Sequence, residues 1–179
     1  MTDFIAFPKI YRYSRDCVVT EKIDGTNGSI YISNEGVFLV GSRTQWITPE
    51  KDNHGFAKWA HENKDELLEL GPGWHFGEWW GYKINRGYGI KERVFSLFNL
   101  KKWGDPYTRP ACCSVVPTLW TGDFPPPVHE ILSELLSNGS MAAPGFMKPE
   151  GIVIHHIAGN FLLKKTFGKD GVEPKINTL

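Results

Sequence analysis

Short strand-like runs dominate this chain and constrain its fold more than any other feature. Seven runs are apolar or alternate apolar with polar residues, and most end at Gly, Asn or Pro, which is typical of β-strands. They cover residues 17–20, 29–33, 36–41, 74–80, 94–100, 151–157 and 160–167. Only two segments, 52–70 and 128–138, have the apolar spacing of an amphipathic helix.

The order of these segments predicts an α+β fold built from antiparallel sheets. Strands and helices do not alternate regularly and no internal repeat is present, so a doubly wound parallel sheet is disfavoured. Residues 105–127 are rich in Pro and Gly and are predicted to form a loop that covers a surface. A chain of 179 residues is long enough for one domain whose hydrophobic core is stable without disulfide bonds or bound metal ions.

The amino-acid composition limits which cellular compartment and which kind of binding partner we expect for this chain. The 20 Lys and Arg residues balance the 20 Asp and Glu residues, so any attraction to nucleic acid must come from a local patch. Three cysteines without framework spacing favour a reducing compartment and disfavour structural zinc. No apolar run approaches the length of a membrane span, and no signal-peptide core is present. We therefore expect a cytoplasmic protein.

Lys22 is the candidate nucleophile. It follows a strand-like run and precedes an Asp24-Gly25 turn and an alternating strand, a pattern that predicts a β-hairpin. An amine flanked by Glu21 and Asp24, near glycines that let a ligand approach the backbone, can attack a phosphorus or carbonyl centre. A lysine at a turn is more often a solvated surface charge, so this segment alone leaves both interpretations open.

Two carboxylates, Glu78 and Glu150, lie beside Gly in otherwise apolar strand runs. A carboxylate in a buried strand needs a partner, so each belongs either to a structural ion pair or to a functional site. The adjacent His155 and His156 point to opposite faces of a strand and cannot easily bind one zinc ion together.

Three further residues have both a functional and an ordinary explanation. Arg43 follows a strand and could reach a phosphate or ribose oxygen, although alone it would be interpreted as a surface arginine. Phe98, in an alternating run, could stack on a purine or pack in the core. Lys164 is the strand cation that we expect near Lys22, or an exposed strand lysine.

A set of ordered motifs resembles a known superfamily. The run Lys22-Ile23-Asp24-Gly25 matches the Lys-x-Asp-Gly signature of the covalent nucleotidyltransferases, which comprise ATP-dependent DNA ligases, RNA ligases and mRNA capping enzymes. The longer run Glu21–Asn27 is most similar to RNA ligases of phage and viral type. Four further segments follow in that family's order, namely Ser42–Thr44, Phe76–Gly81, Phe95–Phe98, and Glu150–Ile154 with Phe161–Lys165. The resemblance spans residues 17–167.

The resemblance implies two packed antiparallel sheets with flanking helices, the ATP-grasp-like nucleotidyltransferase domain, with the nucleotide bound between the sheets. It also implies a role for each matching residue. Lys22 is the nucleophile, Lys164 contacts the α-phosphate, and Glu150 helps to bind the catalytic divalent metal, with Asp24 as a second candidate ligand. The implied nucleotide contacts are Glu21 to the adenine amino group, Arg43 and Glu78 to the ribose, and Phe98 to the adenine ring. Ile23 and Lys165 are also implied as nucleotide-binding residues. Asn27, with Arg43, is tied to the nucleic-acid steps.

The implied activity is that of an ATP-dependent RNA ligase with Mg²⁺ or Mn²⁺ as its metal. Lys22 takes AMP from ATP, AMP passes to a 5′-phosphate, and a 3′-hydroxyl attacks the activated end, with RNA favoured over DNA as substrate. Alternatives are a GTP-using guanylyltransferase of capping type and a non-catalytic nucleotide- or nucleic-acid-binding module. If a phage encodes the chain, the host cytoplasm is the expected location.

Three departures from the family pattern leave questions open. Thr166 stands where a second lysine is usual, so Lys164 and Lys165 compete for one role, with Lys164 favoured by register. Asp24 stands where some RNA ligases carry histidine, which leaves DNA as an alternative substrate. We expect residues 1–179 to form one adenylation domain without a C-terminal OB-type domain, for which a trans-acting domain or protein would substitute.

Overall fold

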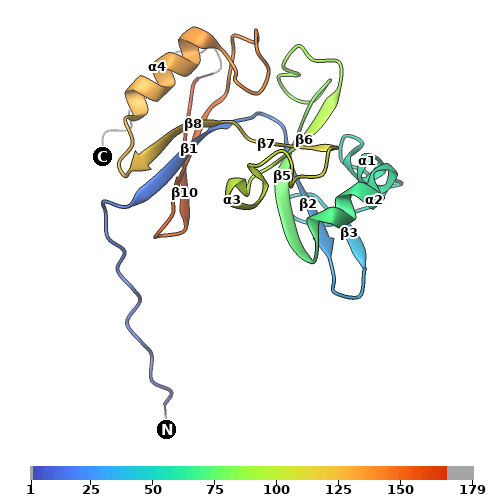
Figure 1. Cartoon of the computed structure of the whole chain (residues 1–179), viewed down its shortest axis with the longest axis horizontal. Coiled ribbons are helices and arrows are strands. Elements are labelled where there is room, and N and C mark those ends of the chain that lie inside the picture. Colours follow the sequence, from blue (N-terminus) through green and yellow to red (C-terminus); the bar gives the residue numbers. More distant parts are fainter. Residues whose placement is uncertain (1, 169–179) are drawn as a thin grey trace.

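The computed structural model describes residues 2–168 and confirms the α+β class. In this range the chain forms ten strands in two sheets, with α1, α2 and α4 on their outer faces and α3 beside the space between them (Figure 1). The strands are β1 Asp16–Lys22, β2 Thr26–Ile32, β3 Phe38–Gly41, β4 Trp46–Ile47, β5 Gly73–Gly81, β6 Arg93–Leu97, β7 Cys113–Val115, β8 Thr118–Asp123, β9 Gly151–His156 and β10 Phe161–Thr166. The helices are α1 Phe56–Glu62, α2 Lys64–Leu67, α3 Leu100–Trp103 and α4 Val128–Asn138, with a 3₁₀ turn at Leu68–Leu70.

The four-stranded sheet has the order β10-β9-β1-β8, and all its pairs are antiparallel. Helix α4 covers one face, because Ile131, Leu132 and Leu135 form an apolar stripe that is buried against residues such as Val19 and Ile154. Gly139, with a φ of 79°, ends this helix in a conformation that glycine adopts without strain. The other face of the sheet is left for the groove described below.

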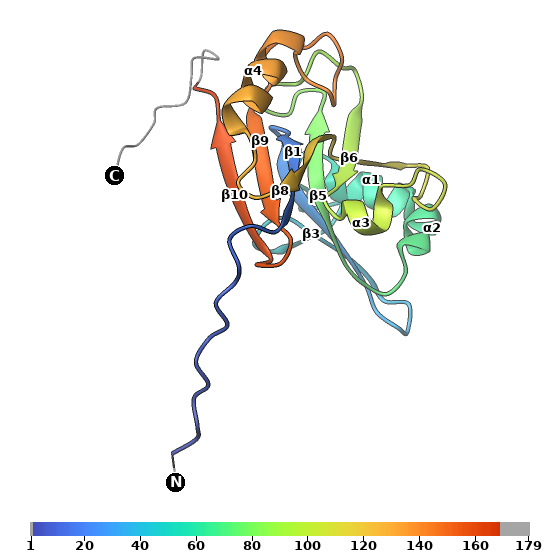
Figure 2. The same cartoon turned by 60° about the vertical axis from the view of Figure 1, so that its left-hand side comes forward.

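The six-stranded sheet has the order β4-β3-β2-β5-β6-β7. Helices α1 and α2 cover its outer face, where Phe56 packs between Trp79 and Phe95 with ring centroids 5.4 and 4.9 Å away. A third, smaller cluster contains Ile23, Trp80, Tyr88, Val116 and Ala143. Ile23 follows β1 and Val116 precedes β8, so the cluster packs the two segments that connect the sheets against Trp80 of β5. Figure 2 shows the two sheets side by side from a second direction.

The expected β-hairpin around Asp24-Gly25 is wrong. Strand β1 is already bonded on both sides, by β8 and β9, while β2 lies between β3 and β5 in the other sheet. The Asp24-Gly25 segment therefore links the two sheets. Glycine is required there because a Cβ at residue 25 would meet the carbonyl oxygen of Trp79.

The expected loop at 105–127 is also partly wrong, because it contains β7 and β8. Strand β8 is a sheet edge and β7 has three residues, and short edge strands carry little apolar pattern from which to recognise them. Strand β7 pairs with β6 in parallel, so the six-stranded sheet is mostly rather than wholly antiparallel. The predicted helix at 52–70 is divided at Asn63 into α1 and α2, and the short elements β4 and α3 were not predicted.

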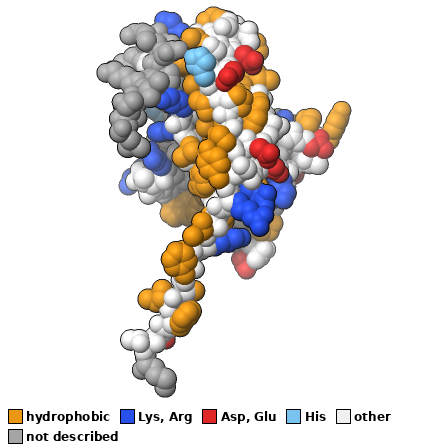
Figure 3. Space-filling view, turned by 90° about the vertical axis from the view of Figure 1, so that its left-hand side faces the viewer, with side chains coloured by type: hydrophobic (Ala, Val, Ile, Leu, Met, Phe, Trp, Pro, Cys, Tyr) orange, Lys and Arg blue, Asp and Glu red, His pale blue; other side chains and the backbone are white. Residues whose placement is uncertain are grey.

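Residues 2–14 form an arm without helix or strand that leads away from the body. Hydrophobic side chains follow one another along this arm (Figure 3), and those of Phe4, Ile5 and Phe7 are more than four-fifths exposed. Within the described part of the chain, none of the helices has the length and apolar character needed to cross a membrane.

Candidate active site

The two sheets enclose a groove of about 980 Å³, within the range typical of nucleotide-sized ligands. Alternation along β1 decides which side chains line it. Cys17, Val19 and Glu21 are buried beneath the sheet, whereas Val18, Thr20 and Lys22 are only partly buried. The last three line the groove, and so does Glu21 although its side chain is buried. Lys22 stands at the end of β1, where the chain leaves for the other sheet.

Lys22, which lines this groove, is held by Glu150. Its Nζ lies 2.7 Å from Oε2 of Glu150, and the two side chains are 24% and 18% exposed. The register of β1 on β9 pairs Lys22 with Gly151, which brings the preceding residue, Glu150, beside the amine. Gly151 has a φ of 150°, and a Cβ there would overlap the backbone of Lys165, so this strand end requires glycine.

Glu78 is the second carboxylate of the site and belongs to the other sheet. Its Oε1 accepts a hydrogen bond from the amide of Gly25, and its Oε2 accepts one from Nδ2 of Asn27, both at 3.0 Å. Burial raises the pKa of Glu78 to about 7, against the opposing effects of the Lys22 charge and the Gly25 amide. Near neutral pH this carboxyl group is therefore divided between its charged and neutral forms.

The segment that links the sheets is fixed by a loop whose importance the sequence did not reveal. The amide of Asp24 donates to the hydroxyl of Tyr88 at 2.7 Å. The Asp24 carboxylate accepts from Nδ2 of Asn85 at 3.0 Å and from Nε of Arg86 at 2.9 Å. Both carboxylate oxygens are thus already bonded, and the predicted role of Asp24 as a metal ligand is untested. The only signal for this loop was its glycine content, at Gly81, Gly87 and Gly89.

Strand β10 separates its two adjacent lysines. Lys164 pairs with Val153 and lines the groove, as Val153 does, whereas Lys165 pairs with the buried core residue Ile152 and is absent from the groove lining. The register therefore puts Lys164 on the same face of the sheet as Lys22. Its predicted contact with the α-phosphate stays a prediction.

Arg43, Phe98 and Ile23 also line the groove. Arg43 lies in the turn between β3 and β4 and is exposed. Phe98 is 41% exposed and follows the end of β6, where its amide donates to the carbonyl of Phe76. Phe98 is therefore not a core residue, which leaves its ring free for the predicted stacking. Ile23 is 3% exposed, because its side chain belongs to the cluster that joins the sheets.

The carboxylate of Glu21 lies on the opposite face of β1 from Lys22. Its Oε2 accepts from the amides of Met141 and Ala142, at 2.8 and 2.9 Å, and burial raises its pKa. Its Oε1 is buried and has no hydrogen-bond partner among the described residues. The structure thus engages one oxygen of Glu21 with the loop after α4, and its predicted contact with adenine stays a prediction.

The described residues contain no group of three or more His, Cys, Asp or Glu side chains that could hold a metal ion. His155 lines the groove and His156 is 1% exposed, so the two rings do face opposite sides as predicted. The donor set still fits Mg²⁺ or Mn²⁺, since Mg²⁺ bound with a triphosphate needs only one or two carboxylates and keeps several waters. Glu150 is the suitable ligand. Its Oε2 accepts the bond from Lys22, whereas its Oε1 has no hydrogen-bond partner within residues 2–168 and is available to a metal ion.

Comparison with known proteins agrees with this fold and with the ordered motifs. A family model described as RNA ligase matches residues 15–167, and the chain belongs to that family. No curated protein matches the sequence.

Among solved structures, similar chains are those of the Naegleria gruberi RNA ligase. A mutant with AMP and Mn has a TM-score of 0.63 at 21% identity, over 86% of this chain and 50% of that one. Another mutant with ATP and Mn has a TM-score of 0.62 at 21% identity, over 84% and 48%. The form with PPi has a TM-score of 0.59 at 22% identity, over 84% and 49%. This chain therefore spans about half the length of those proteins, and at such identities the likeness shows the fold.

Proposed function

We propose that this chain is the nucleotidyltransferase part of an ATP-dependent RNA ligase. The observation that carries the proposal is the Lys22–Glu150 pair at a groove to which both sheets contribute Lys164, Glu78, Arg43 and Phe98. Membership of the RNA ligase family supports RNA as substrate, and the Naegleria gruberi structures with ATP or AMP and Mn support the choice of nucleotide and metal. Three free cysteines agree with a reducing compartment such as the cytoplasm.

In the first step, Nζ of Lys22 attacks the α-phosphorus of ATP. A nitrogen–phosphorus bond forms, the bond from that phosphorus to the bridging oxygen breaks, and pyrophosphate leaves. A lysine amine in water is almost entirely protonated at neutral pH, so a proton must depart before the attack. Glu150 is the acceptor bonded to this amine and is placed to receive that proton.

The remaining groups hold the nucleotide. Lys164 faces the α-phosphate from β10, Glu78 accepts from ribose hydroxyls, and Phe98 supplies a stacking surface for the base. A divalent metal held by Glu150 would neutralise charge on the phosphate oxygens. An oxygen of the RNA 5′-phosphate then attacks the phosphorus of the adduct, the nitrogen–phosphorus bond breaks, and the Lys22 amine is released and regains a proton. Finally a 3′-hydroxyl oxygen loses its proton and attacks the phosphorus of the RNA 5′-phosphate, and AMP leaves as that phosphodiester bond forms.

The test is the intact mass of the protein after incubation with ATP and Mg²⁺ or Mn²⁺. We expect a mass increase of one AMP, peptide mapping that locates it on Lys22, and no adduct in Lys22→Ala. Lys91→Ala, which removes an exposed lysine that does not line the groove, should form the adduct normally. A parallel incubation with GTP tests the capping-type alternative, because such an enzyme would form a GMP adduct instead of an AMP adduct. An adduct on another lysine, or none under either metal while the protein melts cooperatively, would falsify the assignment.

A further inference from the structure

The six-stranded sheet carries an exposed aromatic surface beside the groove. We use the term aromatic platform for Trp46 on β4, Trp74 and Phe76 on β5, and Tyr31 on β2. Trp46, Trp74 and Phe76 are 50%, 51% and 52% exposed, whereas the aromatic residues on the opposite face of this sheet are buried under α1 and α2. Rings of this size that are half exposed and gathered on one face of a sheet mark an interaction site more often than a solvated face.

The rings of the platform are arranged in near-parallel pairs. The centroids of Trp46 and Trp74 are 5.2 Å apart with an interplanar angle of 17°, and those of Trp74 and Phe76 are 5.6 Å apart at 4°. Tyr31 lies against Trp74 at 5.1 Å. Because the sheet already fixes their orientation, these rings present flat faces to a ligand without a large entropic cost.

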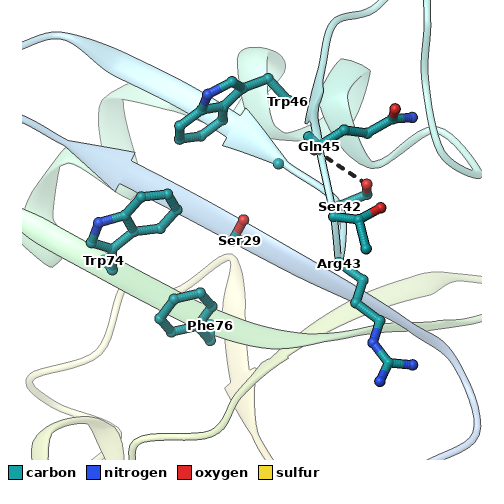
Figure 4. Close-up of a pocket in the computed structure, with 9 residues that line it drawn as sticks. Ser29, Ser42, Arg43, Gln45, Trp46, Trp74 and Phe76 are labelled. Atoms are coloured by element: carbon teal, nitrogen blue, oxygen red, sulfur yellow. Dashed lines mark hydrogen bonds between the residues drawn. The ribbon is translucent and has the colours of Figure 1, made fainter.

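A hollow of about 520 Å³ lies between these rings and the turn that joins β3 to β4 (Figure 4). Its floor includes Ser29, and its far wall is the turn, from which Arg43 extends (Figure 4). Gly41 keeps the floor open, since a Cβ there would meet Oγ of Ser29. The hollow thus combines aromatic faces with hydroxyl groups and one guanidinium, a combination that suits a base with its phosphate.

The hollow is continuous with the groove. Trp74, Phe76 and Glu78 are alternate residues of β5, so they share one face at steps of about 6.8 Å. The register of β2 pairs Tyr31 with Trp74, Ser29 with Phe76, and Asn27 with Glu78. Arg43, Trp74 and Phe76 line both spaces. A nucleic-acid strand whose end lies at Lys22 can therefore extend along the groove and over the rings without interruption.

We propose that the aromatic platform binds unpaired bases of the RNA strand that is being joined, with Arg43 paired to the backbone phosphate between the platform and the groove. This inference rests on the proposed function, which identifies the bound nucleic acid as the RNA that is being joined. An unpaired strand fits better than a duplex, because stacking on protein rings requires a base whose face is free. Base–aromatic stacking tolerates any sequence, so the site adds affinity and direction without sequence preference.

Binding of a 5′-phosphorylated single-stranded oligoribonucleotide, measured by fluorescence anisotropy, tests the proposal. We expect Trp46→Ala to weaken binding about 5- to 150-fold, the range for loss of one stacked base. Trp46→Phe should retain most of the affinity. Tyr107→Ala is the matched control, since Tyr107 is 95% exposed and lines neither space. A fully paired duplex should bind equally to the wild type and to Trp46→Ala.

Self-adenylation separates this inference from the proposed function. Trp46 does not line the groove, so Trp46→Ala should form the adduct at the wild-type rate. If Trp46→Ala does not fold, the Trp46→Thr variant takes its place in the test, because threonine is a strand-favouring residue.

Wild-type affinity for the oligonucleotide in a folded Trp46→Ala or Trp46→Thr protein would overturn the proposal. So would a change in self-association alone, measured by sedimentation, because the platform would then be a protein contact. Absence of the adduct in the wild type refutes the proposed function instead.

Discussion

At the scale of single residues, Glu78 is a carboxyl group of the groove whose pKa is strongly raised by its surroundings. It is 9% exposed, it accepts hydrogen bonds from the Gly25 amide and the Asn27 side chain, and burial raises its pKa from an ordinary 4.5 to about 7. The raised pKa means that folding favours the protonated form of this carboxyl group. The same carboxylate that we expect to accept from the ribose is therefore costly to keep charged.

This shift predicts a dependence of stability on pH. Because the folded pKa exceeds the unfolded one, the stabilising contribution of Glu78 is complete below about pH 4.5 and is lost as the pH rises through about 7. The wild type should therefore lose stability relative to Glu78→Gln, which does not titrate, by the order of a few kcal/mol across that window. Urea unfolding of both proteins at several pH values measures the difference. Parallel pH profiles would show that Glu78 is not perturbed.

The residues that the sequence identified and those that it missed differ in a physical way. Glu78 and Glu150 stand out because a charged side chain beside glycine in an apolar strand run is costly without a partner, and Lys22 because it lies between a strand-like run and an Asp-Gly turn. In the structure Lys22 and Glu78 line the groove, and Glu150 contacts Lys22. Tyr88 and Arg86 were missed, because they act through a hydrogen bond to the Asp24 amide and an ion pair across 62 residues of sequence. No local pattern encodes contacts at that separation.

At the scale of elements, β10 allows a matched comparison of two adjacent lysines. Lys164 lines the groove and Lys165 does not, because neighbouring side chains of a strand point to opposite faces. We expect Lys164→Ala to slow self-adenylation by about 100-fold or more, as loss of a charge that stabilises the transferring phosphate does. Lys165→Ala should change the rate by less than about threefold. Single-turnover rates with saturating ATP give both values, and equal losses would contradict the register argument.

Strands were predicted correctly where burial of one face produces an alternating apolar pattern in the sequence, and they were missed where no such pattern arises. The runs at 17–20, 29–33, 74–80 and 151–157 each fall within or largely on a strand, because one face of each is buried. Strands β7 and β8 lie at sheet edges, where β7 has three residues and β8 buries none of its six, so the sequence pattern predicts a loop there instead. The hairpin prediction failed for a different reason. An Asp-Gly turn between two strands fixes a sharp change of direction, but not whether those strands pair with each other.

At the scale of the whole molecule, the candidate site exists only while both sheets are in place. Lys22, Glu150 and Lys164 belong to the four-stranded sheet or precede its strands, whereas Glu78, Phe98 and Arg43 belong to the six-stranded sheet or its turns. The Asp24-Gly25 segment links the sheets, and one small buried cluster packs the connecting residues Ile23 and Val116 against the six-stranded sheet. A nucleotide in the groove would add contacts to both sheets at once.

Binding of ATP should therefore stabilise the molecule as one unit. At an ATP concentration 100 times the Kd, mass action contributes about 2.7 kcal/mol, which for a chain of this size raises the Tm by roughly 5–10 °C. Lys22→Ala cannot form the proposed adduct, so its Tm shift reports reversible binding alone. Hydrogen exchange with bound ATP provides the spatial test, and slowing is expected in β9 and β10 as well as in β2 and β5. Slowing confined to one sheet would show that the nucleotide does not bridge the groove, and the assignment of residues from both sheets to one site would then be wrong.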